Sequence, residues 1–155
     1  MKLIGALCMV LAALTAANAQ TSAEADVRAA NHAYYAALSA RDMPAMEKIW
    51  VGSPDDTNIA PPVMPVTNEG WEKIKAAYLK FWGTLDSLSV SMDEPTIKVR
   101  GSVAWVHGIE KAQRRTKAGA EQAGTNFGTS IFINQGGRWL MIFHQAAAIS
   151  RPQSN

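Results

Sequence analysis

Cysteine is almost missing from this sequence. The 155 residues contain one, Cys8, and it lies in an apolar run at the N-terminus. If that run is removed, the remaining chain can form no disulfide and offers no thiol nucleophile. The chain also lacks a large excess of charge, because 15 Lys and Arg residues face 13 Asp and Glu residues. Nucleic acids and acidic membrane surfaces attract proteins with a large net positive charge. This chain has almost none, so neither is expected as a partner.

Sites with well-known sequence signatures are missing as well. The sequence has no phosphate-binding loop, no dinucleotide fingerprint and no Gly-x-Ser-x-Gly elbow. The three histidines, His32, His107 and His144, fall in separate predicted elements without the spacing of metal ligands. The sequence therefore predicts neither a bound metal nor a cofactor.

The N-terminus has the three parts of a secretory signal peptide. Lys2 supplies the positive charge, residues 3–14 are almost entirely apolar, and Ala17-Asn18-Ala19 is a small-residue cleavage site. An uncleaved membrane anchor is the alternative, but the run falls short of the about 20 apolar residues that a span needs. We expect a signal peptide over residues 1–19, cleavage near Ala19, a periplasmic or secreted protein, and no membrane contact afterwards.

The rest of the chain has the size of one domain. Removal of residues 1–19 leaves 136 residues with a net charge of +1. A chain of this length can bury a core of its own without disulfides. We therefore expect a single domain over residues 20–155.

Two helices are predicted at the start of this domain. Thr21 and Glu24 have the spacing of a capping box, and apolar residues then recur at helical spacing up to about Arg41. Asp42 is a good N-cap for a second, shorter helix that ends near residue 50. Pro44 lies in the first turn of that helix, where its missing N–H costs little.

A proline-rich segment separates these helices from a third. Residues 51–67 contain four prolines, which exclude a central strand and indicate an ordered loop with one short edge strand. Asn68 then caps the third helix. Its predicted buried face consists of Trp71, Ile74, Tyr78 and Trp82.

The second half changes to a period of two. Apolar residues alternate with small or polar ones, and glycine-containing turns separate the runs. The predicted strand segments are residues 88–92, 97–99, 103–109, 127–133 and 139–148. Three helices followed by a meander of about four long antiparallel strands predict an α+β fold.

Several short segments resemble one family when taken in order. Residues 34–42 with 46–50, then 70–78, and then Gly-Arg-Trp-Leu-Met at 137–141, resemble the SnoaL-like group of the nuclear transport factor 2-like superfamily. The resemblance covers about residues 24–148. It implies three N-terminal helices packed in a curved mixed or antiparallel sheet, which together form a cone with an internal pocket. It also implies a homodimer through the outer face of the sheet.

The resemblance suggests one candidate catalytic residue, but the acidic residues that would act with it are missing. Tyr34 looks like the oxyanion-hole tyrosine of ketosteroid isomerases in this superfamily. The carboxylate base of those enzymes would fall in residues 58–61, and their protonated acid in residues 127–133, but neither stretch contains Asp or Glu. Without a base and a partner acid, proton transfer has no evident agent, so that chemistry is not predicted.

The two strand histidines are the next candidates. Strict alternation places His107 on one face with Trp105, and His144 on one face with Leu140 and Ile142. Relatives end in a strand with two adjacent histidines. By resemblance His144 takes the first, more variable position, and Gln145 replaces the second. A glutamine keeps hydrogen-bonding capacity without a titratable group, which favours binding over acid–base work.

Five tryptophans enrich the chain in aromatic residues that could line a pocket. We therefore expect the cavity to bind a small apolar or aromatic molecule. The predicted ligand-binding residues are Tyr34, Trp50, Trp82, Trp105, His107, Phe143 and Gln145.

Three functions remain open on the sequence alone. The first is an exported small-molecule-binding protein, and the second is a SnoaL-like isomerase, cyclase or hydrolase that uses Tyr34, His107 or Gln145. The third is an interaction module whose cone is filled by side chains. Leu140 and Ile142 on one face of the last strand, with Met141 and Phe143 on the other, favour a homodimer in each case.

Overall fold

The computed structural model describes the backbone of residues 3–60 and 64–149 and the side chains of residues 20–59 and 67–149. The helices are α1 (Leu3–Ala40), α2 (Met43–Glu47) and α3 (Trp71–Trp82). The strands are β1 (Thr57–Ala60), β2 (Met64–Glu69), β3 (Leu85–Met92), β4 (Thr96–Arg100), β5 (Val103–Thr116), β6 (Glu121–Gln135) and β7 (Arg138–Ala148).

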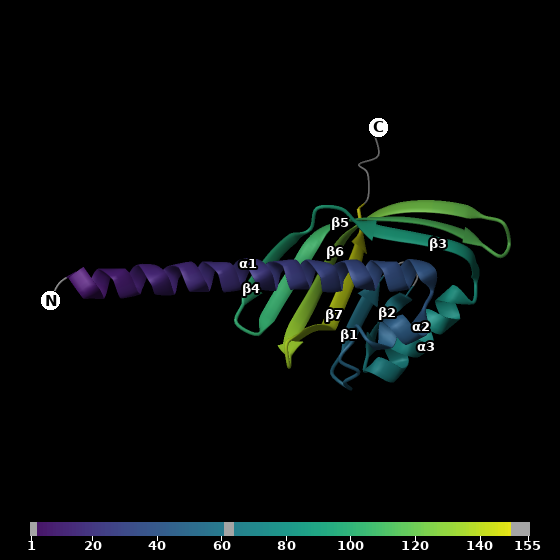
Figure 1. The fold of residues 1–155 in the computed structure, drawn as a ribbon. Coiled ribbons are helices and arrows are strands. Elements are labelled where there is room, and N and C mark those ends of the chain that lie inside the picture. Colours follow the sequence, from purple (N-terminus) through teal and green to yellow (C-terminus); the bar gives the residue numbers. More distant parts are fainter. Residues whose placement is uncertain (1–2, 61–63, 150–155) are drawn as a thin grey trace.

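The strands form one open, mixed sheet in the order β2-β1-β7-β6-β5-β3, with β4 also pairing with β5. All neighbours are antiparallel except β1 and β7, which run parallel. Helix α1 crosses one face of this sheet, and α2 and α3 lie together beyond its C-terminal end (Figure 1). The predicted α+β architecture of three helices against a curved mixed sheet is confirmed.

Helix α1 does not begin where the sequence predicted. It is continuous from Leu3 in the full chain, so Thr21 lies inside the helix. The predicted start at Thr21 refers to the chain that remains after removal of residues 1–19. Its end is close to the prediction. Arg41 has a φ of +56°, in the left-handed region that stops a helix, and its guanidinium donates to the backbone oxygens of Leu85 (2.7 Å) and Asp86 (2.9 Å).

The predicted cap of α2 is confirmed, and that of α3 is wrong. The Asp42 carboxylate accepts the backbone N–H of Ala45 at 3.0 Å. Helix α3 instead begins after Gly70, which has a φ of +86° and packs so closely that a Cβ there would lie 3.3 Å from the Pro54 backbone oxygen. Asn68 belongs to β2.

The proline-rich segment also differs from its prediction. Strands β1 and β2 pair antiparallel with each other, and β1 pairs on its other side with β7. Pro65 lies in β2, at the edge of the sheet, where its missing N–H breaks no ladder. Asn58, expected in a loop, is therefore fixed in a strand directly opposite His144.

A bulge in β7 changes which side chains face the helices. Ile131 pairs with Phe143 and the next residue, Phe132, pairs with Met141, so Ile142 is an extra residue. Beyond the bulge the alternation shifts by one position. His144 therefore faces inward, and its predicted place on one face with Leu140 and Ile142 is wrong.

The long strand β5 shows which face of the sheet is the core. Ala104 and Val106 are fully buried, Glu110 is 5 % exposed, and the residues between them are half-buried or exposed. The concave face therefore carries Ala104, Val106 and Glu110. The outer face carries Trp105 and His107, away from the helices.

Candidate functional site

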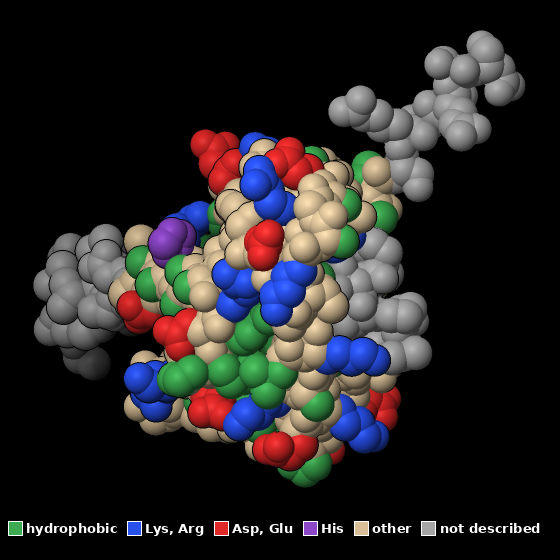
Figure 2. All heavy atoms as spheres, turned by 90° about the vertical axis from the view of Figure 1, so that its right-hand side faces the viewer, with side chains coloured by type: hydrophobic (Ala, Val, Ile, Leu, Met, Phe, Trp, Pro, Cys, Tyr) green, Lys and Arg blue, Asp and Glu red, His purple; other side chains and the backbone are tan. Residues whose placement is uncertain are grey.

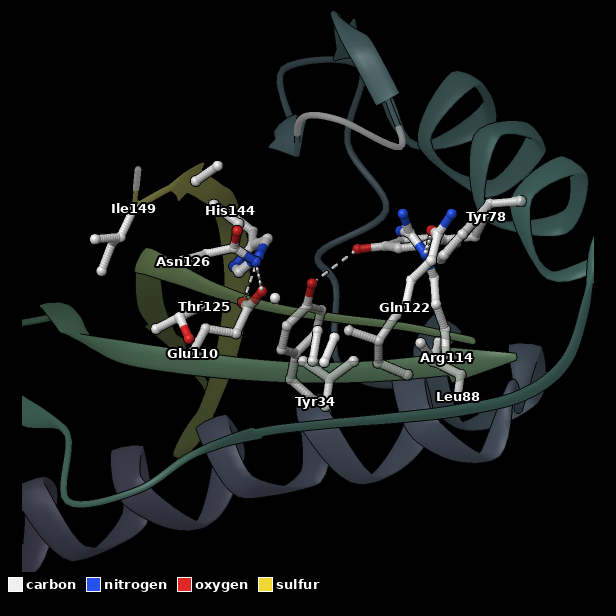
Figure 3. Close-up of a pocket in the computed structure, with 18 residues that line it drawn as sticks. Tyr34, Tyr78, Leu88, Glu110, Arg114, Gln122, Thr125, Asn126, His144 and Ile149 are labelled. Atoms are coloured by element: carbon white, nitrogen blue, oxygen red, sulfur yellow. Dashed lines mark hydrogen bonds and ion pairs between the residues drawn. The ribbon is translucent and has the colours of Figure 1, made fainter. Parts of the chain in front are cut away.

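A cavity of about 270 Å³ lies between α1, α3 and the concave face of the sheet (Figure 3). One part of its wall is apolar and is formed by Leu38, Phe81, Leu88, Val90 and Ala112. The polar part includes Tyr34, Tyr78, Glu110, Arg114, Asn126 and His144. A mostly apolar pocket with a few converging polar groups is the usual form of a small-molecule site.

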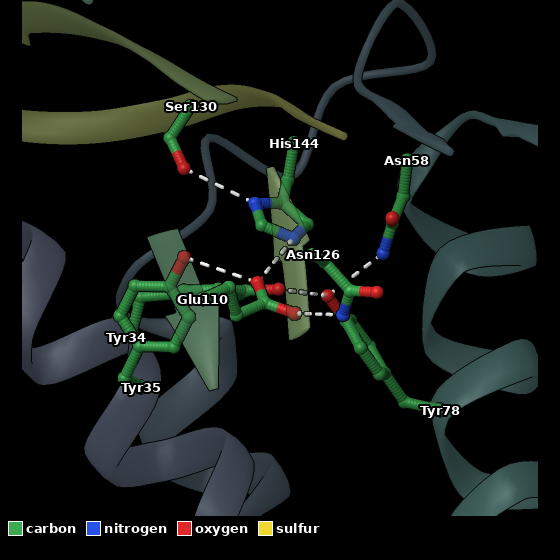
Figure 4. A network of polar contacts seen from close by, with 8 residues as sticks. All are labelled: Tyr34, Tyr35, Asn58, Tyr78, Glu110, Asn126, Ser130 and His144. Atoms are coloured by element: carbon green, nitrogen blue, oxygen red, sulfur yellow. Dashed lines mark hydrogen bonds and ion pairs between the residues drawn. The ribbon is translucent and has the colours of Figure 1, made fainter. Parts of the chain in front are cut away.

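Glu110, on β5, places a carboxylate in this wall. Its Oε2 accepts the hydroxyl of Tyr35 at 3.2 Å, and its Oε1 accepts the side-chain amide of Asn126 at 2.9 Å. Such donors offset part of the cost of burying a charge. The carboxylate is thus held in one orientation from two sides, by α1 and by β6 (Figure 4).

His144 faces the same carboxylate from β7. Its Nε2 lies 3.7 Å from Glu110 Oε2, and its Nδ1 lies 3.1 Å from the hydroxyl oxygen of Ser130. If the Ser130 hydroxyl donates to Nδ1, the ring proton sits on Nε2 and points to Glu110. Ser130 is completely buried and is not part of the cavity wall, so it orients the imidazole and is not placed to act as a nucleophile.

Burial lowers the pKa of His144, although the nearby Glu110 opposes that shift. The physical cause is that an imidazolium would lose its hydration in this site. His144 is therefore a neutral hydrogen-bond donor near neutral pH.

A pair of tyrosines supplies a hydrogen-bond donor. The hydroxyl oxygens of Tyr34 and Tyr78 are 3.0 Å apart, and the Asn58 side-chain amide donates to Tyr78 at 2.7 Å. The two phenols carry two protons, and the bond between them uses one. The other proton has no acceptor among the described residues and belongs to a phenol in the cavity wall.

Burial raises the pKa of both phenols well above the usual value, so both stay protonated. Their rings are held by aromatic packing. The Tyr78 ring stacks on Trp82 with centroids 5.4 Å apart, and the Tyr34 ring lies 4.8 Å from the His144 ring. Packed rings hold their hydroxyls in fixed positions, which a preorganised donor requires.

Gly128 on β6 leaves room above all for the Met92 side chain. A Cβ at this position would lie 2.7 Å from Met92 Cε, 3.3 Å from the Tyr35 hydroxyl and 3.4 Å from Glu110 Oε2. Its role is to provide space for these side chains.

The predicted ligand-binding residues do not gather around this cavity. Tyr34 lines it, Trp82 supports Tyr78 from behind, and Trp50 packs on Trp71 with ring centroids 6.0 Å apart. The other four lie on the outer face of the sheet: Trp105, His107, Phe143 and Gln145.

Sequence reasoning missed Glu110, Tyr78 and Asn126 as site residues. A signal for Glu110 was present, because it continues the alternation of Ala104 and Val106 along β5. The larger side chains of β5, Trp105 and His107, lie on the outer face instead. The small residues face inward because α1 and its tyrosines fill that side.

Two features are absent from the part of the chain that the structure describes. No group of three or more His, Cys, Asp or Glu side chains there is arranged to hold a metal ion. No helix within that part of the chain combines the length and apolar character needed to cross a membrane.

Comparison with known proteins identifies relatives by family and by fold. The model of the SnoaL-like domain family matches residues 27–150. Comparison with curated proteins finds no significant match.

Solved structures of the nuclear transport factor 2-like superfamily are similar. A member from Salmonella enterica serovar Typhimurium is 15 % identical with a TM-score of 0.77, over 84 % of this chain and 94 % of its own. A ketosteroid isomerase-like protein from Erwinia carotovora atroseptica is 19 % identical with a TM-score of 0.69, over 83 % and 97 %. A protein of unknown function from Pseudomonas putida is 18 % identical with a TM-score of 0.70, over 86 % and 91 %.

Proposed function

The chain belongs to the SnoaL-like domain family and has the nuclear transport factor 2-like fold, and from this premise we propose that it is an isomerase-type enzyme acting on a small, largely apolar carbonyl compound. The observation that supports this is the Glu110 carboxylate in the same cavity wall as a phenol with an unused proton. A base and an oxyanion donor on one cavity are what proton transfer beside a carbonyl requires.

The proposed reaction begins at the carbon next to the carbonyl. Glu110 takes a proton from this carbon, and the electron pair of the C–H bond moves toward the carbonyl oxygen. The spare phenolic proton of the Tyr34–Tyr78 pair hydrogen-bonds that oxygen and stabilises its negative charge. If the substrate has a carbon–carbon double bond beside that carbon, the intermediate is a dienolate. Return of the proton from Glu110 to the far end of the dienolate then shifts the double bond and completes an isomerisation with no atoms gained or lost.

His144 has a supporting role in this scheme. Its Nε2–H faces the Glu110 carboxylate while Ser130 holds the other ring nitrogen. A neutral donor there steadies the carboxylate between proton transfers and does not compete for the substrate proton. Asn58 acts in a similar way on the phenols, because its amide fixes the Tyr78 oxygen.

This scheme uses a different base from the one the family resemblance suggested. The stretch at 58–61 has no carboxylate, and its first residue instead holds Tyr78. The proposed base comes from β5 instead of the 58–61 stretch.

Hydrogen exchange would test the proposal. Purified protein is mixed with cyclohexanone or β-tetralone in D₂O, and loss of the signal of the protons next to the carbonyl is followed by NMR. We expect catalysed exchange, reduced about 100-fold or more by Glu110→Gln. Glu121→Gln is the matched control, because Glu121 is an exposed carboxylate paired with Arg115.

The tyrosines give a second comparison in the same assay. Either Tyr34→Phe or Tyr78→Phe leaves one phenol, so each should slow exchange less than the double substitution. Exchange that is equally fast with Glu110→Gln would rule out this base, and absence of exchange with both ketones would contradict the proposed chemistry.

Binding without catalysis is the second candidate. The observation in its favour is that both Glu110 oxygens already accept hydrogen bonds, so the polar network is satisfied without a substrate. The apolar wall of the cavity would then supply the affinity. Calorimetric binding of β-tetralone without any exchange would favour this candidate over the enzyme.

We also propose that the protein works outside the cytoplasm after loss of residues 1–19. Support comes from the order of a basic residue, an apolar run and Ala17-Asn18-Ala19. Intact-mass measurement of the exported protein should give a chain that begins at Gln20. A mass that includes Met1 would contradict cleavage.

A further inference from the structure

Arg114 is a cation in the cavity wall that has no ion-pair partner among the residues that the structure describes. It follows Glu110 by four residues on β5, so its side chain points to the same concave face. The neighbouring cations are neutralised: Lys111 pairs with Asp93 at 2.8 Å, and Arg115 pairs with Glu121. Every Asp and Glu of the chain lies among the described residues, and none of them forms an ion pair with Arg114 there.

Other contacts hold the Arg114 guanidinium in place. Its Nε donates to the side-chain oxygen of Gln122 at 2.6 Å, and its central carbon lies 5.9 Å from the centre of the Phe81 ring. The two terminal nitrogens are left without a partner among the described residues. A half-buried guanidinium that is fixed at one nitrogen presents its remaining N–H groups as a planar fork.

Arg114 lies at the opposite end of the site from Glu110. In Figure 3, Arg114 and Gln122 stand beside Tyr78, whereas Glu110, Asn126 and His144 stand beyond Tyr34. Ala112 lies between Arg114 and Glu110 on β5, and Val90 lies opposite Ala112 on β3, so the wall between these groups is apolar. The end of the molecule that carries α3 and the β5–β6 hairpin shows hydrophobic and basic side chains next to each other (Figure 2).

We propose that the cavity takes an organic anion, with a carboxylate held by Arg114 and an apolar body that extends toward Glu110. This inference rests on the proposed function, since it names the substrate class of the same site. A carboxylate fits because a guanidinium binds it through two parallel hydrogen bonds, and the single positive charge of the guanidinium balances the single negative charge of the carboxylate. The side-chain nitrogen of Gln122, whose oxygen is taken by Arg114, is available as a further donor.

The test compares two ligands that share an apolar body, one of which carries a negative charge. Binding of β-naphthoate and of β-naphthamide to the purified protein is measured by titration calorimetry at low ionic strength. We expect the naphthoate to bind about tenfold tighter or more. Arg114→Met should remove this preference and leave naphthamide binding unchanged, while Arg115→Met, which removes a paired cation, should keep it. Circular dichroism confirms that both variants fold.

Two further measurements keep the inference falsifiable if Arg114→Met does not fold. Arg114→Lys should keep part of the preference for the anion, because it keeps the charge and loses the fork. Added KCl should weaken naphthoate binding to the unaltered protein and leave naphthamide binding almost unchanged.

The outcomes separate this inference from the proposed function. Equal affinity for both ligands, or a preference that persists in Arg114→Met, would overturn the role of Arg114 and leave the exchange chemistry standing. Failure of both ligands to bind would overturn the inference as well, and exchange of β-tetralone would then decide the proposed function independently. A preference lost only in Arg114→Met supports the inference.

Discussion

At the residue scale, burial shifts the pKa values of side chains in the cavity wall. The effect on stability is tested most directly at His144. Its pKa in the folded protein is lowered, so the unfolded chain binds a proton more readily than the folded one below about pH 6.5. Stability linked to His144 is therefore fully present above that pH and is lost as the pH falls below it.

Replacing His144 should make the stability less sensitive to acid. His144→Gln should lose about 1 kcal/mol at pH 7.5, because the contact with Ser130 is weakened. It should also lose less stability than the unaltered protein between pH 6.5 and 5, by up to about 1 kcal/mol per pH unit. Urea unfolding at several pH values measures both effects. The control is His32→Gln on the exposed face of α1, and parallel curves for the unaltered protein and His144→Gln would contradict the prediction.

At the scale of elements, the end of α1 depends on Arg41. This residue occupies a left-handed conformation, which costs a side chain about 1 kcal/mol relative to glycine, yet its guanidinium joins α1 to the start of β3. Two charge-assisted hydrogen bonds to backbone oxygens outweigh that cost.

Two substitutions separate the strain from the hydrogen bonds. Arg41→Ala keeps the strain and loses both bonds, and should destabilise the protein by about 2 to 3 kcal/mol. Arg41→Gly loses the same bonds but removes the strain, so it should be about 1 kcal/mol more stable than Arg41→Ala. Free energies of unfolding in urea give the order, and a glycine variant less stable than the alanine variant would contradict it.

Some features of these elements could be predicted from the sequence, and others could not. The cap of Asp42 was predictable because it depends on residues within one turn, and the family resemblance identified Tyr34 and the order of the elements. The inward face of β5 was not predictable from periodicity, because alternation gives two faces without saying which one meets the helices. His144 was misplaced because the bulge at Ile142 arises from pairing with β6, which lies beyond any local pattern.

At the scale of the whole molecule, the outer face of the sheet exposes large apolar side chains that the proposed function does not explain. Val103, Ile109 and Phe127 are 40 %, 42 % and 46 % exposed, and Ile109 lies directly opposite Phe127 in the sheet. Apolar side chains gathered on one face favour association of two copies. We propose a homodimer through this face.

Sedimentation should therefore show a dimer at micromolar concentration. Ile109→Glu should shift it to monomer, because a carboxylate in an apolar interface is costly to desolvate. Leu79→Glu is the control, since Leu79 is equally apolar and 50 % exposed but belongs to α3. A monomer in the unaltered protein would contradict the proposal.

The missing side chain at Gly128 implies a rule for how related sequences can vary. A Cβ there would begin 2.7 Å from Met92 Cε, closer than the Tyr35 hydroxyl at 3.3 Å or Glu110 Oε2 at 3.4 Å. A relative that carries a larger residue at position 128 therefore needs a shorter or displaced side chain at position 92. An alignment should show positions 92 and 128 changing together.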